Sequence, residues 1–254
     1  MSFFKKAFAS IGIGSAKIDT RLVKDSYAPG EEVVGEVEIR GGSTEQQIAD
    51  IYLSLHTTYI KERDDKKYTA TAEIGRFRLA DSFIIQPDER RVVPFSFVLP
   101  ADTPLSLGRT KVWVAAGLDI QNAVDPTDKD IIHVVPNRLM AEVIKSVGEL
   151  GFKLREADCQ EARRLRTRLP IIQEFEFIPV TGPYRGRLDE LELVFLPGNG
   201  AMEILLQVDR RARGLGGFLA EALEMDETKV KLTVSDADIL HLKDKINSTI
   251  QRYS

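Results

Sequence analysis

Hydrophobic and polar residues alternate through much of the first half of the chain. Apolar residues recur at every second position in four segments, residues 33–39, 51–59, 93–99 and 112–120. Successive side chains of a β-strand point to opposite faces, so this period of two is typical of half-buried strands. The pattern predicts several β-strands between residues 17 and 135.

Turn-forming residues separate these segments. Pro29-Gly30, Gly41-Gly42 and Pro87-Asp88 lie between them, and no regular helical pattern intervenes. Strands that follow one another through short turns favour antiparallel sheets, because parallel neighbours need a long crossover. Residues 1–135 are therefore predicted to form an antiparallel β-sandwich.

The pattern changes after residue 135 and then returns to strands. Asn137 is predicted to cap a helix, because Val143 and Val147 belong to an apolar stripe with helical spacing. Further strands are predicted at residues 174–180, 188–196, 202–208 and 229–234, with a short helix at 216–224. Residues 136–235 are thus predicted to form a second antiparallel β-sandwich, so that the fold class is mainly β with two tandem sandwich domains.

The last segment, residues 236–254, is predicted to be a helix. Ser235 and Asp238 have the spacing of a capping box. One face of this helix carries the apolar residues Ile239, Leu242, Ile246 and Ile250. This stripe either packs on the second sandwich or is buried against a second copy of the chain, which would make the protein a self-associating scaffold.

Composition limits the classes of partner. The chain is 43% apolar and 29% charged, as in soluble globular proteins, and its net charge of -4 disfavours nucleic acid as a partner. Cys159 is the only cysteine, which fits a reducing compartment. No stretch reaches the roughly 20 apolar residues of a membrane span, so a cytoplasmic location is expected.

The N-terminus is amphipathic. Phe3, Phe4 and Phe8 accompany Lys5 and Lys6. The segment either lies on a membrane or partner surface or packs on its own sandwich. Packing is favoured, because two lysines attract anionic lipid only weakly.

The sequence offers little for catalysis or metal binding. His56, His133 and His241 are far apart and lack the spacing of metal ligands, so we predict no metal site. Acidic neighbours of Cys159 oppose formation of a thiolate, which favours a packed side chain over a nucleophile. Gly12 and Gly14 lack the third glycine of a dinucleotide-binding motif. We therefore expect no catalytic residue, no cofactor and no enzyme activity.

An acidic loop region is predicted from the end of the fourth strand onward. It contains Asp119, Asp125, Asp128 and Asp130, without the glycine and closing glutamate of a calcium-binding loop. We predict a solvated turn built on Asp125-Pro126.

Two arginine groups stand out in this mildly acidic protein. They contain Arg163, Arg164, Arg166, Arg168, Arg210, Arg211 and Arg213. If the second sandwich brings them together, their guanidinium groups suit carboxylates, phosphates and acidic peptides of a protein partner. The alternative is ion pairing within the chain, to acids such as Asp158 and Glu190.

Several motifs resemble those of known regulators. The run from Tyr27 to Val37 resembles a strand–turn–strand motif of arrestin-like N-terminal domains. The bacterial sporulation-control protein family (stage-zero protein M) is resembled over nearly the whole chain, in residues 1–6, 12–17, 117–126, 154–159, 173–177, 184–186 and 208–215.

The resemblance implies two tandem arrestin-like sandwiches, a cytoplasmic location, a regulatory role and no enzyme activity. Together with the residues, it predicts a non-enzymatic adaptor that acts through protein–protein interaction.

Overall fold

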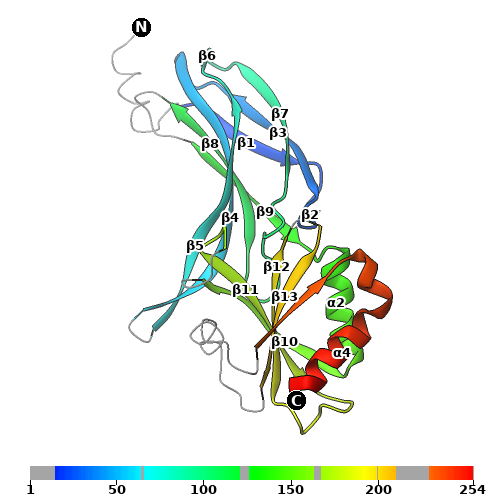
Figure 1. The fold of residues 1–254 in the computed structure, drawn as a ribbon. Coiled ribbons are helices and arrows are strands. Elements are labelled where there is room, and N and C mark those ends of the chain that lie inside the picture. The colour runs from blue at the N-terminus through cyan, green and yellow to red at the C-terminus, as the bar shows by residue number, and fades with distance from the viewer. Residues whose placement is uncertain are drawn as a thin grey trace. The chain divides into compact units, whose positions relative to one another are not determined.

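The computed structural model describes residues 15–63, 66–120, 126–162, 167–198, 200–209 and 229–253. Figure 1 shows that strands dominate the fold. The strands are β1 (Lys17–Leu22), β2 (Ser26–Tyr27), β3 (Glu32–Arg40), β4 (Gln46–Arg63), β5 (Lys66–Ala80), β6 (Phe83–Ile85), β7 (Arg90–Val98), β8 (Val112–Ile120), β9 (Thr127–Val134), β10 (Phe152–Glu161), β11 (Ile171–Pro179), β12 (Glu190–Pro197), β13 (Met202–Asp209) and β14 (Lys229–Val234). The helices are α2 (Arg138–Glu149), the 3₁₀ helix η1 (Asp236–His241) and α4 (Leu242–Tyr253).

The described strands form a small sheet and a large mixed sheet. The small sheet has the order β1-β3-β7, and the large one has the order β14-β13-β12-β11-β10-β4-β8-β9-β2, with β5 and β6 paired to β4. The prediction of a mainly β fold with a C-terminal helix is confirmed. The prediction of purely antiparallel pairing is wrong, because β10 pairs in parallel with β4, and β2 pairs in parallel with β9.

The chain divides into two compact units. Unit 1 comprises residues 1–57, 73–100 and 111–134, and unit 2 comprises residues 58–72, 101–110 and 135–254. Two segments that the sequence assigned to the first domain therefore belong to unit 2.

The core of unit 1 follows the predicted alternation. Val33 and Val37 of β3 are fully buried, and Phe97 of β7 stacks on Phe77 of β5 at 4.2 Å between ring centroids. Gly35 is required by close packing, because a Cβ there would lie 2.5 Å from the Arg21 carbonyl oxygen.

Unit 2 places α2 and α4 beside strands β10 to β14 (Figure 1). The predicted cap is confirmed, since the Met140 N–H donates to Asn137 Oδ1 at 3.0 Å. Neither helix is long and apolar enough to span a membrane among the residues described. The helix predicted at residues 216–224 lies outside the described residues.

The C-terminal helix begins as predicted but in a different form. The Ser235 N–H donates to Asp238 Oδ2 at 2.8 Å, and a 3₁₀ turn precedes α4. Leu242, Ile246 and Ile250 are at most 1% exposed, while Ile239 is only partly buried. Most of the stripe is therefore buried within a single chain. Self-association stays a prediction, and within this stripe only Ile239 offers it partly exposed apolar surface.

Candidate functional site

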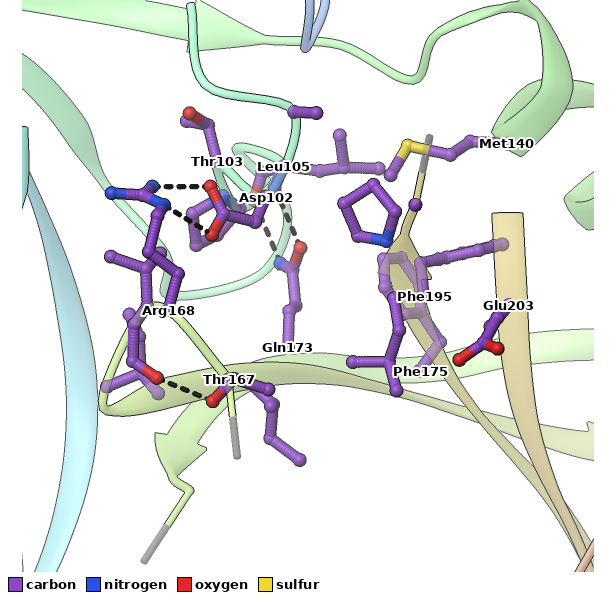
Figure 2. A pocket seen from close by; sticks show the side chains of 18 residues that line it. Asp102, Thr103, Leu105, Met140, Thr167, Arg168, Gln173, Phe175, Phe195 and Glu203 are labelled. Carbon is purple, nitrogen blue, oxygen red and sulfur yellow. Dashed lines mark hydrogen bonds and ion pairs between the residues drawn. The ribbon is translucent and has the colours of Figure 1, made fainter. Parts of the chain in front are cut away.

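Unit 2 contains a pocket of about 320 Å³. It lies between the loop at residues 101–105 and the ends of β11, β12 and β13, with one residue from α2 (Figure 2). Its apolar lining includes Pro104, Leu105, Met140, Leu169, Ile172, Phe175, Phe195 and Leu196. These segments are distant in sequence, so tertiary packing alone assembles the pocket.

Two aromatic rings form part of the wall. Phe175 and Phe195 meet edge to face, with ring centroids 5.1 Å apart. This arrangement is favourable because the positive edge of one ring meets the negative face of the other. The strand register explains it, since β11 and β12 are paired antiparallel neighbours. The wall is therefore part of the folded sheet.

Gln173 fixes the loop to this wall. The Leu105 N–H donates to Gln173 Oε1 at 2.7 Å, and Gln173 Nε2 donates to the Leu105 carbonyl at 2.9 Å. Figure 2 shows both bonds side by side. The Gln173 side-chain amide thus bonds to Leu105 as the backbone of a neighbouring strand would. It satisfies the buried N–H and carbonyl of Leu105.

Charged side chains at the pocket are paired. Arg168 donates through Nε to Asp102 Oδ2 at 2.9 Å and holds the second carboxylate oxygen through Nη2 (Figure 2). Glu203 forms an ion pair with Lys231 at 2.6 Å. Forked pairing orients Arg168 and Asp102, although exposed ion pairs stabilise a fold only weakly. The pocket therefore combines an apolar wall with charges that are already neutralised.

The chain was compared with known proteins. Residues 4–212 match the family described as "Spo0M: SpoOM protein". The sporulation-control protein spo0M of Bacillus subtilis (strain 168) is 47% identical over 239 residues, which cover 94% of this chain and 93% of that protein. This chain belongs to the Spo0M sporulation-control protein family.

A solved structure agrees with this assignment. The crystal structure of Spo0M from Bacillus subtilis matches with a TM-score of 0.90 and 43% identity, covering 95% of this chain and 100% of that one. The Spo0M family resemblance predicted from the sequence motifs is confirmed.

Most of the predicted arginine site lies outside the described residues of this Spo0M family member, namely Arg163, Arg164, Arg166, Arg210, Arg211 and Arg213. Arg168 is described and lies at the pocket, where it pairs with Asp102. Asp158 and Glu190, the proposed internal partners, pair with Arg109 and Arg155.

The sequence did not reveal a buried acidic face in unit 2. It contains Glu156, Asp158, Glu174, Glu176, Glu190 and Glu192, and all but Glu156 are at most 3% exposed. Opposite positions in the register place them on one face, as Glu156, Glu176 and Glu192 illustrate. Acidic residues at every second position predict a solvated face, so their burial was not expected.

Burial changes the chemistry of these acids. It raises the pKa of Glu174 to about 7, and the charges of Glu190 and Glu156 add to the effect. Arg155 contacts Glu176 and lies 2.8 Å from Glu190. A carboxyl group such as Glu174 therefore titrates near neutral pH.

The remaining candidates for chemistry are dispersed or buried. Cys159 is 1% exposed, and burial raises the pKa of its thiol to about 12. His56 stacks on Trp113 at 5.4 Å, and burial lowers its pKa. No cluster of His, Cys, Asp or Glu suited to a metal ion occurs among the described residues.

The predicted turn is built on Asp125, which lies outside the described residues, but the wider prediction of an acidic loop is wrong for the other three aspartates. Asp119 lies in β8, whereas Asp128 and Asp130 lie in β9. Asp128 is a structural acceptor, because its Oδ2 receives the Thr20 N–H at 2.7 Å. Burial, with Asp128 nearby, raises the pKa of Asp130 to about 6.

Proposed function

We propose that this chain is a non-enzymatic regulatory adaptor, built on arrestin-like sandwiches, that acts in the cytoplasm by binding other proteins. The observation that carries the proposal is the pocket of unit 2. An apolar side chain of a partner would leave water there and contact Phe175, Phe195 and Leu105. The curated relative's name supports a control role, since that protein is described as controlling sporulation.

The paired charges favour binding over catalysis. General acid–base catalysis needs a side chain able to exchange a proton with a substrate. At this pocket Asp102 and Arg168 hold each other, and Glu203 is held by Lys231. The pocket volume of about 320 Å³ suits one or two apolar side chains of a protein segment.

A filled pocket tests this function. Ala101 lines the pocket and is exposed, so Ala101→Trp is expected to occupy the cavity without disturbing the core. The measurement is quantitative affinity capture of partner proteins from cells of the source organism. We expect the amount of specifically bound partner to fall about tenfold with Ala101→Trp, equivalent to about 1.4 kcal/mol.

Ala101→Ser is the matched control and should capture as much partner as the natural chain. Equal capture by Ala101→Trp would contradict the role of the pocket.

A further inference from the structure

β7 ends the small sheet of unit 1, and its outward-facing groups can be identified. The Leu99 N–H donates to the Glu31 carbonyl at 2.8 Å, and the Gly41 N–H donates to the Glu89 carbonyl at 2.8 Å. The backbone N–H and carbonyl groups of the odd-numbered residues in and around β7 therefore point toward β3. Backbone groups alternate in direction along a strand, so those of Val92, Pro94, Ser96 and Val98 face away from β3.

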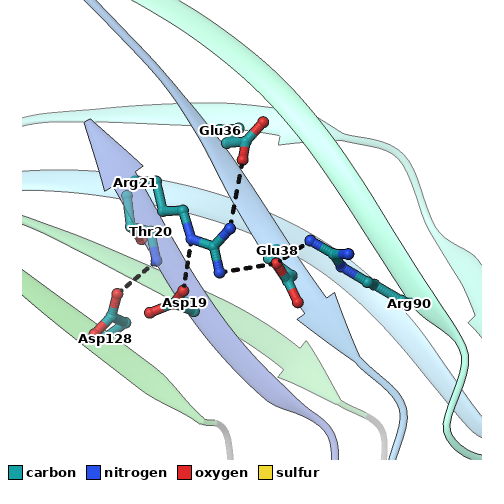
Figure 3. Close-up of polar contacts among 7 residues, drawn as sticks. All are labelled: Asp19, Thr20, Arg21, Glu36, Glu38, Arg90 and Asp128. Atoms are coloured by element: carbon teal, nitrogen blue, oxygen red, sulfur yellow. Dashed lines mark hydrogen bonds and ion pairs between the residues drawn. The ribbon is translucent and has the colours of Figure 1, made fainter. Parts of the chain in front are cut away.

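Other strand edges carry side chains that block pairing. On β1 the Thr20 N–H is occupied by Asp128 (Figure 3). On β14 the Thr233 carbonyl accepts a bond from Lys245 Nζ at 2.7 Å. Such contacts are a known protection against strand addition. Within the described residues, no strand pairs with the outer edge of β7. In the half of β7 from Pro94 to Val98, the residue that hinders pairing is Pro94, because it lacks an N–H.

The side chains along this edge differ from one end to the other. At the start of β7, Arg90 pairs with Glu38 at 2.7 Å, and Arg21 joins them at 3.0 Å (Figure 3). Toward its end the exposed side chains of β7 are uncharged, namely Pro94, Ser96 and Val98, and Val98 is 61% exposed. On β3, Val34 lies opposite Ser96 and Glu32 lies opposite Val98. This half of the edge combines outward backbone groups with the side chains of Pro94 and Val98, beside which those of an added strand would pack.

We propose that the Pro94–Val98 half of β7 binds an extended segment of a partner protein by strand addition. The segment would carry aliphatic or β-branched residues at alternate positions, to pack beside Pro94 and Val98. Backbone bonds to Ser96 and Val98 would supply affinity, and the side chains of Pro94 and Val98 would supply selectivity. The surface belongs to unit 1, so it rests on the proposed function only in that both bind proteins.

A second copy of the chain fits this edge less well. Antiparallel pairing about a two-fold axis at Pro94 sets proline against proline and Arg90 against Val98. An axis at Ser96 sets Pro94 against Val98. Symmetry repeats the missing N–H of Pro94 in either case, whereas a partner segment meets it at most once.

Photo-crosslinking in the full chain tests the proposal. Benzoylphenylalanine replaces Val98 in cells of the source organism, and mass spectrometry identifies the captured peptide. We expect a segment with alternating aliphatic residues from another protein. Adding Ser96→Pro should reduce the crosslinked product about tenfold, since it removes an outward N–H while leaving the bonds to β3. Ser96→Thr is the matched control and should retain the product.

Three results would overturn the proposal: no crosslinked partner, a captured peptide from this chain itself, or undiminished crosslinking with Ser96→Pro. Circular dichroism checks that each variant is folded. Ala101→Trp should leave this crosslink intact, so the edge and the pocket can fail independently.

Discussion

Glu174 is the residue whose environment departs furthest from what its sequence suggests. It is 1% exposed, and burial raises its pKa to about 7. The folded state therefore holds the proton more tightly than the unfolded state, where the pKa is near 4.5. Its contribution to stability is complete below pH 4.5 and is lost as the pH rises through about 7.

Glu174→Gln should remove this loss. The amide keeps an oxygen for the bond from Gln160 Nε2 and has no charge to bury. We expect the free energy of unfolding to rise by roughly 1–3 kcal/mol at pH 8 relative to the natural chain, and by much less at pH 4.5. Urea unfolding from pH 4.5 to 8.5 measures this difference.

Glu203→Gln is the control, because its side chain is 40% exposed in an ion pair with Lys231. It should change stability by no more than about 1 kcal/mol. A constant difference between Glu174→Gln and the natural chain at all pH values would contradict the titration of Glu174.

Cys159 provides a second prediction at the residue scale. Its thiol is 1% exposed, lies 3.6 Å from Thr110 Oγ1 and has a pKa raised to about 12 by burial. Because the thiolate is the reactive form, iodoacetamide at pH 8 should label the native chain far more slowly than the urea-unfolded chain. Mass spectrometry over time measures both rates; equal rates would show that the site is open in the native state.

At the scale of elements, local patterns predicted what local physics determines. The alternation of β3 and β8 and the cap at Asn137 were visible because each depends on neighbouring residues. β5 and β10 were missed, since charged residues interrupt their apolar pattern. The pocket was not predictable: Arg168 was its only candidate residue, and it was chosen for another reason.

The loop at residues 101–105 is the element that the pocket depends on, and Gln173 is its main tether. Gln173→Leu should leave the buried N–H and carbonyl of Leu105 without partners, at a cost of about 2–4 kcal/mol in the free energy of unfolding. The Leu105 amide should also exchange faster with deuterium. Asp102→Asn, which weakens only an exposed ion pair of the same loop, should cost less than about 1 kcal/mol. Similar costs for both would contradict the dominant role of Gln173.

At the scale of the whole molecule, the two units are not separated by a single boundary in the sequence, because unit 2 also takes segments from the first half of the chain. The change of pattern near residue 135 suggested a cut between two domains, and unit 1 contains nothing beyond Val134. Unit 2, however, takes residues 58–72 and 101–110 from the first half. The segment at residues 101–110 supplies Leu105 to Gln173 and Arg109 to Asp158. Long-range contacts of this kind leave no trace in local periodicity.

A fragment of residues 136–254 should therefore not fold stably by itself. Without Arg109, Asp158 would remain a buried carboxylate, 2% exposed and deprived of its ion-pair partner, and Gln173 would lose both bonds to Leu105. A buried polar group left without its partner typically costs about 1–3 kcal/mol, so these losses together are a large share of the stability of such a domain. Circular dichroism should show no cooperative melting for this fragment, whereas co-expression with residues 1–135 should restore it. A fragment that melts cooperatively at the temperature of the intact chain would show that unit 2 does not need these segments.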